Sequence, residues 1–302
     1  MDTPAAQADP HAEPAKRRRI RELEVMVADT IADTHDTTTL VLFTGNDRLE
    51  YQPGHFCTID PHEFPQLERF TAFLEDQKGK KEPPRAYSLA SAPHEKYLAI
   101  TVKEEKYVSG TTKYPPLLSP LLVHRLPRGT RLVITGFTGP YVLPPDISTR
   151  TDHLVHVCAG SGIVPNYSII KHCLVELPNM KHTLVYSNKT HDDIIFRKQL
   201  DELQRDNPDK LKVVYTLTRD AAASSHGNSY RSGRLNETLL KEFIPDPSAV
   251  QVFCCGPGIT KFDKETARAK GEEPAPRFLE SSLAALEAIG ISKKQIHRES
   301  YG

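Results

Sequence analysis

The half of the chain after residue 149 alternates between short apolar runs and longer amphipathic patterns. The apolar runs are residues 153–159, 181–187, 211–218, 250–255 and 296–300. The helical patterns between them are residues 165–177, 194–206, 234–243 and 278–289. Strands that alternate with helices form a parallel sheet covered by helices on both faces. This half therefore predicts a doubly wound α/β domain with a five-stranded parallel sheet over residues 149–302.

The first half follows a different pattern, in which short strand-like runs are separated by turn residues. These runs are residues 23–27, 39–43, 98–102 and 131–134, and a further short strand is expected after residues 53–56. Regular short strands with Gly and Pro between them are typical of a small antiparallel β-barrel. We therefore expect a barrel domain over residues 20–148.

Composition limits the partners of the chain. Residues 1–19 are rich in Ala and Pro and end in four basic residues, which predicts a disordered tail, with a nuclear or nucleic-acid signal as the alternative. Lys+Arg and Asp+Glu balance at 39 each, so no global field favours nucleic acid or an anionic membrane. The chain has no apolar run long enough to span a bilayer and no secretory h-region. We expect neither a nucleic-acid nor a membrane partner.

The cysteines indicate a reducing compartment. Their number is odd and they lack framework spacing, which predicts a cytoplasmic protein without structural disulfides. No C-x4-C-x2-C run is present, so the chain cannot hold a plant-type [2Fe–2S] cluster of its own. We expect no metal site, and any iron–sulfur partner must be a separate protein.

Residues 85–91 combine three kinds of chemistry in one short segment. Arg85 offers a planar cation to a phosphate, Tyr87 an aromatic face to a ring, and Ser88 a hydroxyl to a ring nitrogen. On an extended strand Arg85 and Tyr87 share one face, and Ala86 and Ser88 the other. A flat, phosphorylated cofactor could use all three groups, which indicates a flavin.

Two turns in the second half have the chemistry of a nucleotide site. The first parallel strand ends in Gly160, Ser161 and Gly162, and Pro165 follows in the first turn of a helix. The two glycines would let the backbone approach a diphosphate, and the free N–H groups of a helix start favour an anion. The alternative is a tight strand-to-helix turn without a ligand.

The fourth parallel strand ends in residues 254–257, at the edge of the sheet where ligands bind. We expect Cys254 to be a small buried hydrophobe, and Cys255, Gly256 and Pro257 to belong to a ligand site.

These motifs, in this order, resemble the ferredoxin–NADP reductase superfamily over about residues 21–302. The flavin motif R-x-Y-S-x-x-S/T is matched by Arg85, Tyr87, Ser88 and Ser91. Further matches are P-G-Q-F at 53–56 with His for Gln, the nucleotide loop at 159–165 with one glycine fewer, C-G-P at 255–257, and the closing I-x-x-E-x-F-G at 296–302 with Tyr for Phe. The G-P-x-G-x-F element is only approximated by residues 136–141.

The resemblance implies hydride transfer from nicotinamide C4 to the N5 atom of FAD, with FMN less favoured, followed by single-electron release to an acceptor. It places Ser88, Cys255 and Glu299 around nicotinamide C4, and Tyr301 over the flavin ring. The implied cofactor-binding set is Arg85, Ala86, Tyr87, Ser88, Ser91, Val102, Lys103, Ser119, Gly160, Ser161, Gly162, Pro165, Lys189, Thr218, Arg219, Gly256, Pro257 and Tyr301.

The choice between NADPH and NADH depends on the ends of the second and third parallel strands. No acid directly follows the second strand, which ends at Lys189, although Asp192 and Asp193 come soon after. The third strand ends in Thr218 and Arg219, which resemble the Ser-Arg pair that binds the 2′-phosphate in NADP-dependent relatives. We therefore favour NADPH. The alternative is that Lys189 and Arg219 are solvated surface cations.

The sequence is compatible with more than one role for each of two insertions and with more than one electron acceptor. Residues 62–84 carry apolar side chains at helical spacing, namely Phe64, Leu67, Phe70, Phe73 and Leu74, which predicts an amphipathic helix packed on the barrel, or a lid. Residues 258–276 form a polar insertion, either a mobile loop or an acceptor-docking surface. The acceptor would be a ferredoxin, another redox protein such as an oxygenase component, or a small oxidant. A reductase subunit of a larger complex and a non-catalytic flavin- or nucleotide-binding module are the alternatives.

Overall fold

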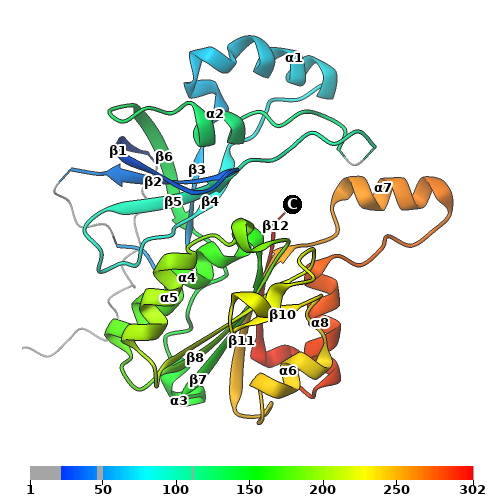
Figure 1. The fold of residues 1–302 in the computed structure, drawn as a ribbon. Coiled ribbons are helices and arrows are strands. Elements are labelled where there is room, and N and C mark those ends of the chain that lie inside the picture. Colours follow the sequence, from blue (N-terminus) through cyan, green and yellow to red (C-terminus); the bar gives the residue numbers. More distant parts are fainter. Residues whose placement is uncertain (1–21, 46–49, 111, 302) are drawn as a thin grey trace, which may run out of the picture.

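A computed structural model describes residues 22–45, 50–110 and 112–301, which fold into two successive six-stranded sheets (Figure 1). The predicted tail over residues 1–19 and the final Gly302 of the closing motif lie outside the described residues. The first sheet ends at Thr138 and the second begins at His153. The domain boundary at residues 148–149 falls between them and remains a prediction.

The first sheet is antiparallel and has the order β4-β3-β6-β1-β2-β5. Its strands are β1 (Leu23–Thr34), β2 (Thr37–Phe43), β3 (Phe56–Ile59), β4 (Arg85–Ser88), β5 (Leu98–Lys103) and β6 (Arg131–Thr138). A bridge between Leu89, just after β4, and Ile100 of β5 joins the two edges of this sheet. The first sheet therefore curls into the predicted barrel.

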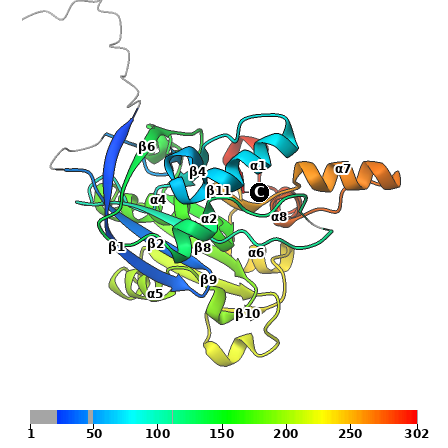
Figure 2. The ribbon, with the colours of Figure 1, turned by 90° about the horizontal axis from the view of Figure 1, so that it is seen from above.

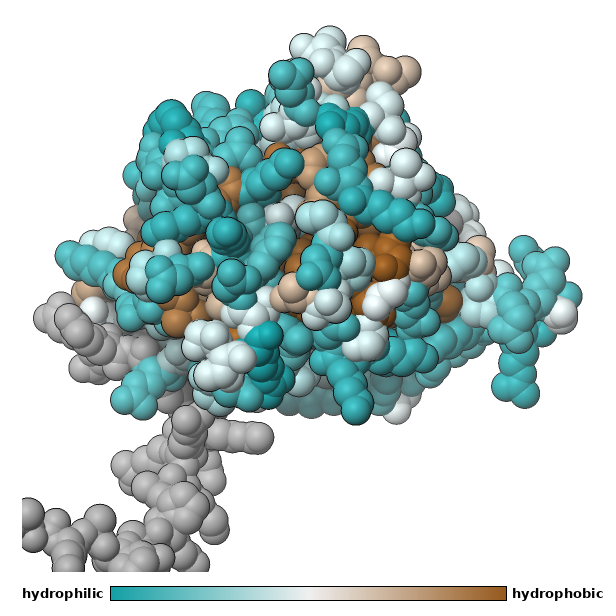
Figure 3. Space-filling view, turned by 90° about the horizontal axis from the view of Figure 1, so that it is seen from below, coloured by the Kyte–Doolittle hydropathy of each residue, from teal (hydrophilic) through white to brown (hydrophobic). Residues whose placement is uncertain are grey.

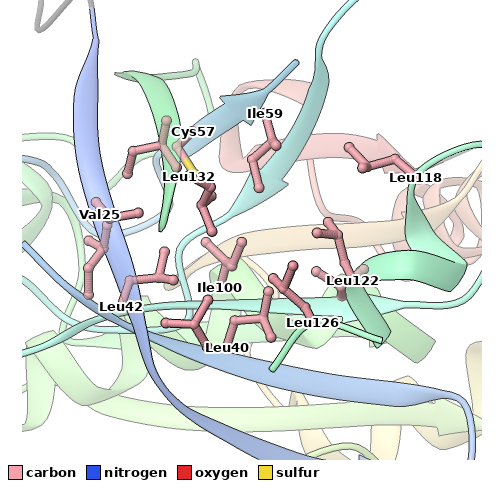
Figure 4. Close-up of a cluster of buried hydrophobic side chains, with 14 of the residues drawn as sticks. Val25, Leu40, Leu42, Cys57, Ile59, Ile100, Leu118, Leu122, Leu126 and Leu132 are labelled. Carbon is pink, nitrogen blue, oxygen red and sulfur yellow. The ribbon is translucent and has the colours of Figure 1, made fainter. Parts of the chain in front are cut away.

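The inside of the barrel is filled by aliphatic side chains. Val25, Leu40, Leu42 and Ile100 come from the strands, and Leu122 comes from α2 (Ser119–His124), which lies over the end of the barrel. Figure 4 shows these side chains pointing toward one another. Burial of such residues is the main stabilising contribution to a small barrel.

The insertion before β4 forms α1 (Glu68–Lys78), as predicted, but its inward face differs from the expected one. Thr71 and Leu74 are buried, whereas Phe73 is 53% exposed. Two 3-10 turns, η1 (Pro61–Glu63) and η2 (Pro65–Leu67), precede α1 and each begins with a proline. The predicted apolar series therefore crosses a change of helix type, so its members do not share one face.

The second sheet is parallel, with the order β10-β9-β8-β7-β11-β12. Its strands are β7 (His153–Ala159), β8 (Lys181–Asn188), β9 (Leu211–Leu217), β10 (Tyr230–Ser232), β11 (Val250–Pro257) and β12 (Ile296–Tyr301). The expectation of five strands is wrong in one detail, because β10 forms a sixth strand at one edge. Three residues are too few to produce a recognisable apolar run.

Helices cover both faces of the second sheet (Figure 1). They are α4 (Ile163–Glu176), α5 (Arg197–Asp206), α6 (Glu237–Phe243) and α8 (Phe278–Ala288), with a short α3 (Ile147–Arg150) before the sheet. Leu200 of α5 packs in one cluster with β8 and β9, while Leu240 and Leu286 of α6 and α8 pack in another cluster with β7 and β11. The predicted doubly wound arrangement is confirmed.

The insertion after β11 contains a helix, α7 (Lys261–Lys270), where we expected a mobile loop or a docking surface. Thr260 and Asp263 form its capping box, and Gly271 ends it with φ 70°. Ala267 is its buried residue, and the helix projects from the body (Figures 1 and 2). On the face shown in Figure 3, the arm at the position of α7 is hydrophilic, and apolar residues form small separate patches.

Among the described residues, none of the helices has both the length and the apolar character needed to cross a bilayer.

Candidate active site at the junction of the two sheets

A cavity of about 650 Å³ lies at the carboxyl ends of β7, β8, β9 and β11. The strand order reverses between β7 and β11, the point where open parallel sheets bind ligands. The wall includes the predicted nucleotide-binding residues Gly160, Ser161, Lys189, Thr218, Arg219 and Pro257, together with Lys103 from the barrel. The structure thus gathers residues from four strand ends around one cavity.

The two glycines of the loop after β7 differ in backbone conformation and in packing. This loop is a 3-10 turn, η3 (Gly160–Gly162), and Gly160 has φ 53°. A Cβ at Gly162 would lie 2.2 Å from the backbone oxygen of Cys255, so only glycine fits against β11. Gly162 and Pro165 are buried behind the cavity wall. Close packing on β11 is therefore one reason for glycine at position 162, and a role of both glycines in the approach of a diphosphate remains a prediction.

The cavity is strongly basic. Lys189, Arg219 and Arg234 line it and form no ion pair with any described carboxylate. The carboxylate of Asp193 accepts hydrogen bonds from the backbone and the hydroxyl of Thr190, at 3.0 and 2.7 Å, and is thereby occupied. The cavity therefore offers free cations to an anionic ligand.

The side-chain amide of Asn188 supports the same interpretation. Asn188 lines the cavity and is buried, and apart from a contact with the Tyr186 hydroxyl its side-chain amide has no hydrogen-bond partner in the described structure. Buried amides are normally satisfied, so this amide indicates a ligand with matching donor and acceptor groups. A dinucleotide fits this donor set.

Beside the cavity, the predicted catalytic residues converge. Cys255 on β11 and Glu299 on β12 are register partners, and so are Pro257 and Tyr301. The Tyr301 hydroxyl forms hydrogen bonds with the hydroxyl of Ser88, at the end of β4, and with the Cys255 thiol. Ser88, Cys255, Glu299 and Tyr301 therefore form one cluster between the two sheets.

The protonation states in this cluster follow from burial. Burial, together with the nearby Glu299, raises the pKa of Cys255 well above its usual value, so the thiol is neutral and a poor nucleophile. Burial also raises the pKa of Glu299 to about 7. One carboxyl oxygen of Glu299 is buried with no hydrogen-bond partner in the part of the chain described. Glu299 can therefore gain or lose a proton near neutral pH.

On the barrel side, β4 is the edge strand of its sheet and carries the predicted flavin-binding groups. Arg85 and Tyr87 are half-buried on one face, and Ala86 is exposed on the other. Arg85 is ion-paired with Glu82. A cation, an aromatic ring and the hydroxyl of Ser88 thus follow one another along β4, which fits a phosphorylated flavin.

Three predicted flavin-binding side chains are engaged within the barrel. Ser91 is buried, and its hydroxyl bonds to the Tyr51 hydroxyl at 2.9 Å and accepts from the Ala99 N–H at 3.0 Å. The Ser119 hydroxyl is also buried and accepts the Glu105 N–H at 3.0 Å, and Val102 is buried. These contacts hold the barrel loops, and the binding roles of these residues remain predictions.

Arg234, Arg277 and Phe278 line the cavity but were missed in the sequence. Arg277 is held by Asp263 of α7 through its Nε and Nη2 atoms, each 2.7 Å from a carboxylate oxygen. The ring of Phe278 packs on Gly256, where a Cβ would lie 2.5 Å from it. Gly256 therefore supports the wall from behind. Arg234 and Phe278 were the first residues of two predicted helices, but no motif in the sequence pointed to them or to Arg277 as parts of a site.

Comparison with known families agrees with this geometry. Residues 156–264 match the model of the oxidoreductase NAD-binding domain. NADH-cytochrome b5 reductase 2 of Coccidioides immitis (strain RS) is 30% identical over 251 residues, covering 78% of this chain and 70% of that protein. The proteins of the same name from Botryotinia fuckeliana (strain B05.10) and Homo sapiens are 28% and 33% identical, with 62% and 44% of this chain covered. The chain spans about half the length of these two relatives, 51% and 49%.

Solved structures share the whole fold. The flavohem-like FAD/NAD binding domain of nitric oxide dioxygenase from Vibrio cholerae O1 biovar El Tor has a TM-score of 0.68 at 21% identity, covering 94% of this chain and 100% of that one. Ferredoxin-NADP+ reductase from Plasmodium falciparum has a TM-score of 0.64 at 16% identity, with the same coverage. The chain therefore belongs to the ferredoxin–NADP reductase superfamily of flavoprotein NAD(P)H oxidoreductases, and its sequence relatives are NADH-cytochrome b5 reductases.

Proposed function

We propose that this protein is an FAD-dependent NADPH reductase that passes electrons to a separate redox protein. The observation that carries the proposal is the convergence of Ser88 with Cys255, Glu299 and Tyr301 next to the basic cavity. The barrel edge that would hold a flavin and the strand ends that would hold a nucleotide meet at this cluster. One site can thus bring two cofactor rings together.

The residues have distinct roles in this proposal. Bound FAD supplies the hydride acceptor and the capacity to release electrons one at a time. Arg85 binds its phosphate, Tyr87 packs along the isoalloxazine and ribityl, and the hydroxyl of Ser88 orients the ring edge that receives the hydride. The neutral thiol of Cys255 shapes the approach of the nicotinamide, and Glu299 holds a proton at its carboxyl group. Tyr301 covers the position that the nicotinamide must enter.

The preference for NADPH is argued from charge. A 2′-phosphate needs cations, whereas a ribose diol is usually bound by a free carboxylate after the second strand. Here Lys189, Arg219 and Arg234 are free, and Asp193 is occupied by Thr190. The names of the relatives carry NADH, so both nucleotides must be compared directly.

The electron acceptor in this proposal is a small redox protein that takes up one electron at a time. The relatives are named for cytochrome b5, and other proteins of this fold are named for ferredoxin. A small one-electron haem or iron–sulfur protein fits a flavin that divides a hydride into single electrons.

The test is spectroscopic. Protein purified with added FAD should show flavin absorbance near ~450 nm, and NADPH should bleach this absorbance. With NADPH present, the protein should reduce cytochrome b5 or a ferredoxin catalytically. A colourless protein that does not retain FAD would overturn the proposal.

A further inference from the structure

A buried carboxylate lies three residues before Arg85. Glu82 is 1% exposed and is bound on both oxygens, by Lys78 Nζ on Oε1 and by Arg85 Nη2 on Oε2, each at 2.5 Å. Burial alone would raise the pKa of Glu82, but the hydrogen bonds from Lys78 and Arg85 lower it below the ordinary value. Glu82 is therefore a charged group paired with two cations.

The insertion that carries Glu82 packs on the barrel core through Phe64 and Leu67, and a series of polar contacts also links it to the barrel. The Glu82 N–H donates to Glu75 Oε1 at 2.7 Å, and the same oxygen lies 2.9 Å from Nε2 of His62. His62 in turn contacts Asp60, which directly follows β3. Within α1 only Thr71 and Leu74 are buried. The polar contacts therefore run from the end of β3, through α1, to Glu82.

These contacts end at the arginine of the flavin motif. Arg85 pairs in register with Ile59, the last residue of β3, so both ends of the polar series lie on the same pair of strands. The Arg85 guanidinium bonds to Glu82 and to the backbone oxygen of Pro83. These two contacts leave further N–H groups of its five-donor fork available to a ligand.

An arginine that is already held loses little rotamer freedom when it binds an anion. Binding groups whose orientation is set by a buried partner are more effective than groups that must be ordered by the ligand. The negative charge of Glu82 has the opposite effect on affinity, because an anion near the expected position of a phosphate repels it. These two effects predict opposite results for removal of the carboxylate.

We propose that Glu82 is a positioning residue that holds Arg85 for the phosphate of the flavin, and that this is the role of the insertion at residues 62–84. The inference rests on the proposed function, because it requires a flavin phosphate at Arg85. Lys78 balances the buried charge of Glu82, so that Arg85 remains available to the ligand.

The test is a binding titration of full-length, flavin-free protein with FAD and with riboflavin, which lacks phosphate. Glu82→Gln should weaken FAD binding on the order of tenfold, the lower end of what the outer partners of binding groups contribute. Riboflavin binding should stay unchanged. In an Arg85→Ala background, Glu82→Gln should cause little further loss of FAD affinity, because the effects of residues in one network are not additive. Glu68→Gln, at an exposed position of α1, is the matched control.

Each outcome decides the inference. Unchanged or tighter FAD binding by Glu82→Gln, or an equal loss for riboflavin, would overturn it. If Glu82→Gln fails to fold, Glu82→Asp keeps the negative charge but shortens the side chain that reaches Arg85, and the same selective loss for FAD is expected. Unmodified protein that binds no FAD would overturn the proposed function as well, so the two failures are distinguishable.

Discussion

The hydroxyl of Ser88 on β4 and the hydroxyl of Tyr301 on β12 share a hydrogen bond across the junction of the two sheets. The two residues are 213 positions apart in the chain. Tyr301 also bonds to Cys255, so it lies between the expected flavin edge and the thiol at the end of β11. A nicotinamide that reaches Ser88 must therefore displace Tyr301.

Shortening Tyr301 should expose the nicotinamide position. We expect Tyr301→Ser to bind NADP+ about tenfold more tightly, because no ring has to be displaced before binding. Titration of the flavin absorbance with NADP+ measures the dissociation constant. Tyr301→Phe keeps the ring and should change affinity much less. Equal affinities in all three proteins would show that Tyr301 does not cover the site.

Glu299 should make flavin reduction depend on pH. Its pKa of about 7 lies above the ordinary value, so the carboxyl is neutral below about pH 7 and charged above it. A negative charge beside the ring opposes the arrival of a hydride, so the reduction rate should fall as pH rises through about 7. Stopped-flow reduction across pH 5.5–8.5 measures this (a range about 1.5 units either side of the pKa). The step should vanish in Glu299→Gln, and its persistence there would assign it to another group.

The carboxyl of Glu299 should also make the free energy of unfolding of the protein decrease as pH rises. The folded state holds the proton of Glu299 more tightly than the unfolded state does. Its contribution is therefore lost progressively between the ordinary pKa of a glutamate and about 7. Glu299→Gln should flatten this part of the stability profile in denaturant titrations at matched pH values.

The free cations of the cavity should determine nucleotide preference. Arg219→Ala and Lys189→Ala should each raise the KM for NADPH about tenfold and leave the KM for NADH nearly unchanged, because only NADPH carries the 2′-phosphate. Steady-state kinetics with both nucleotides measure the two constants. Lys294→Ala, an exposed cation outside the cavity, is the control. Parallel changes for NADPH and NADH would exclude a 2′-phosphate site at these residues.

Buried histidines should make the second sheet sensitive to acid. His156 is fully buried, and burial lowers its pKa to about 4, while His182, 3.1 Å away, is lowered as well. The unfolded chain takes up these protons near pH 6.5, so stability is full above that pH and is lost as pH falls toward 4. For His156 the loss is about 3 kcal/mol.

Chemical unfolding at pH 7 and pH 4.5 should show this difference. In His156→Gln, whose amide can still donate to Asn166, the difference between the two pH values should shrink. An unchanged difference would mean that other groups control the acid sensitivity.

The sequence predicted the two sheets, and it singled out candidate site residues that the structure brings together, because both depend on local patterns. Strand and helix periods are local, and the motifs around Ser88, Cys255 and Glu299 occur in a fixed order. The tertiary contacts were not predictable. The pairing of Glu82 with Arg85 requires α1 to fold back, and the role of Gly162 depends on its approach to β11. α7 was missed because its composition is polar and it carries almost no buried face.

Anaerobic mixing of the FAD-loaded protein with NADPH, and separately with NADH, tests the central claim most directly. We expect one equivalent of NADPH to bleach the flavin band near ~450 nm. NADH should act less efficiently, and Ser88→Ala should slow the bleaching at least about tenfold with flavin content unchanged. Faster bleaching by NADH would contradict only the preference for NADPH. A fully bound flavin that neither nucleotide bleaches would contradict the account.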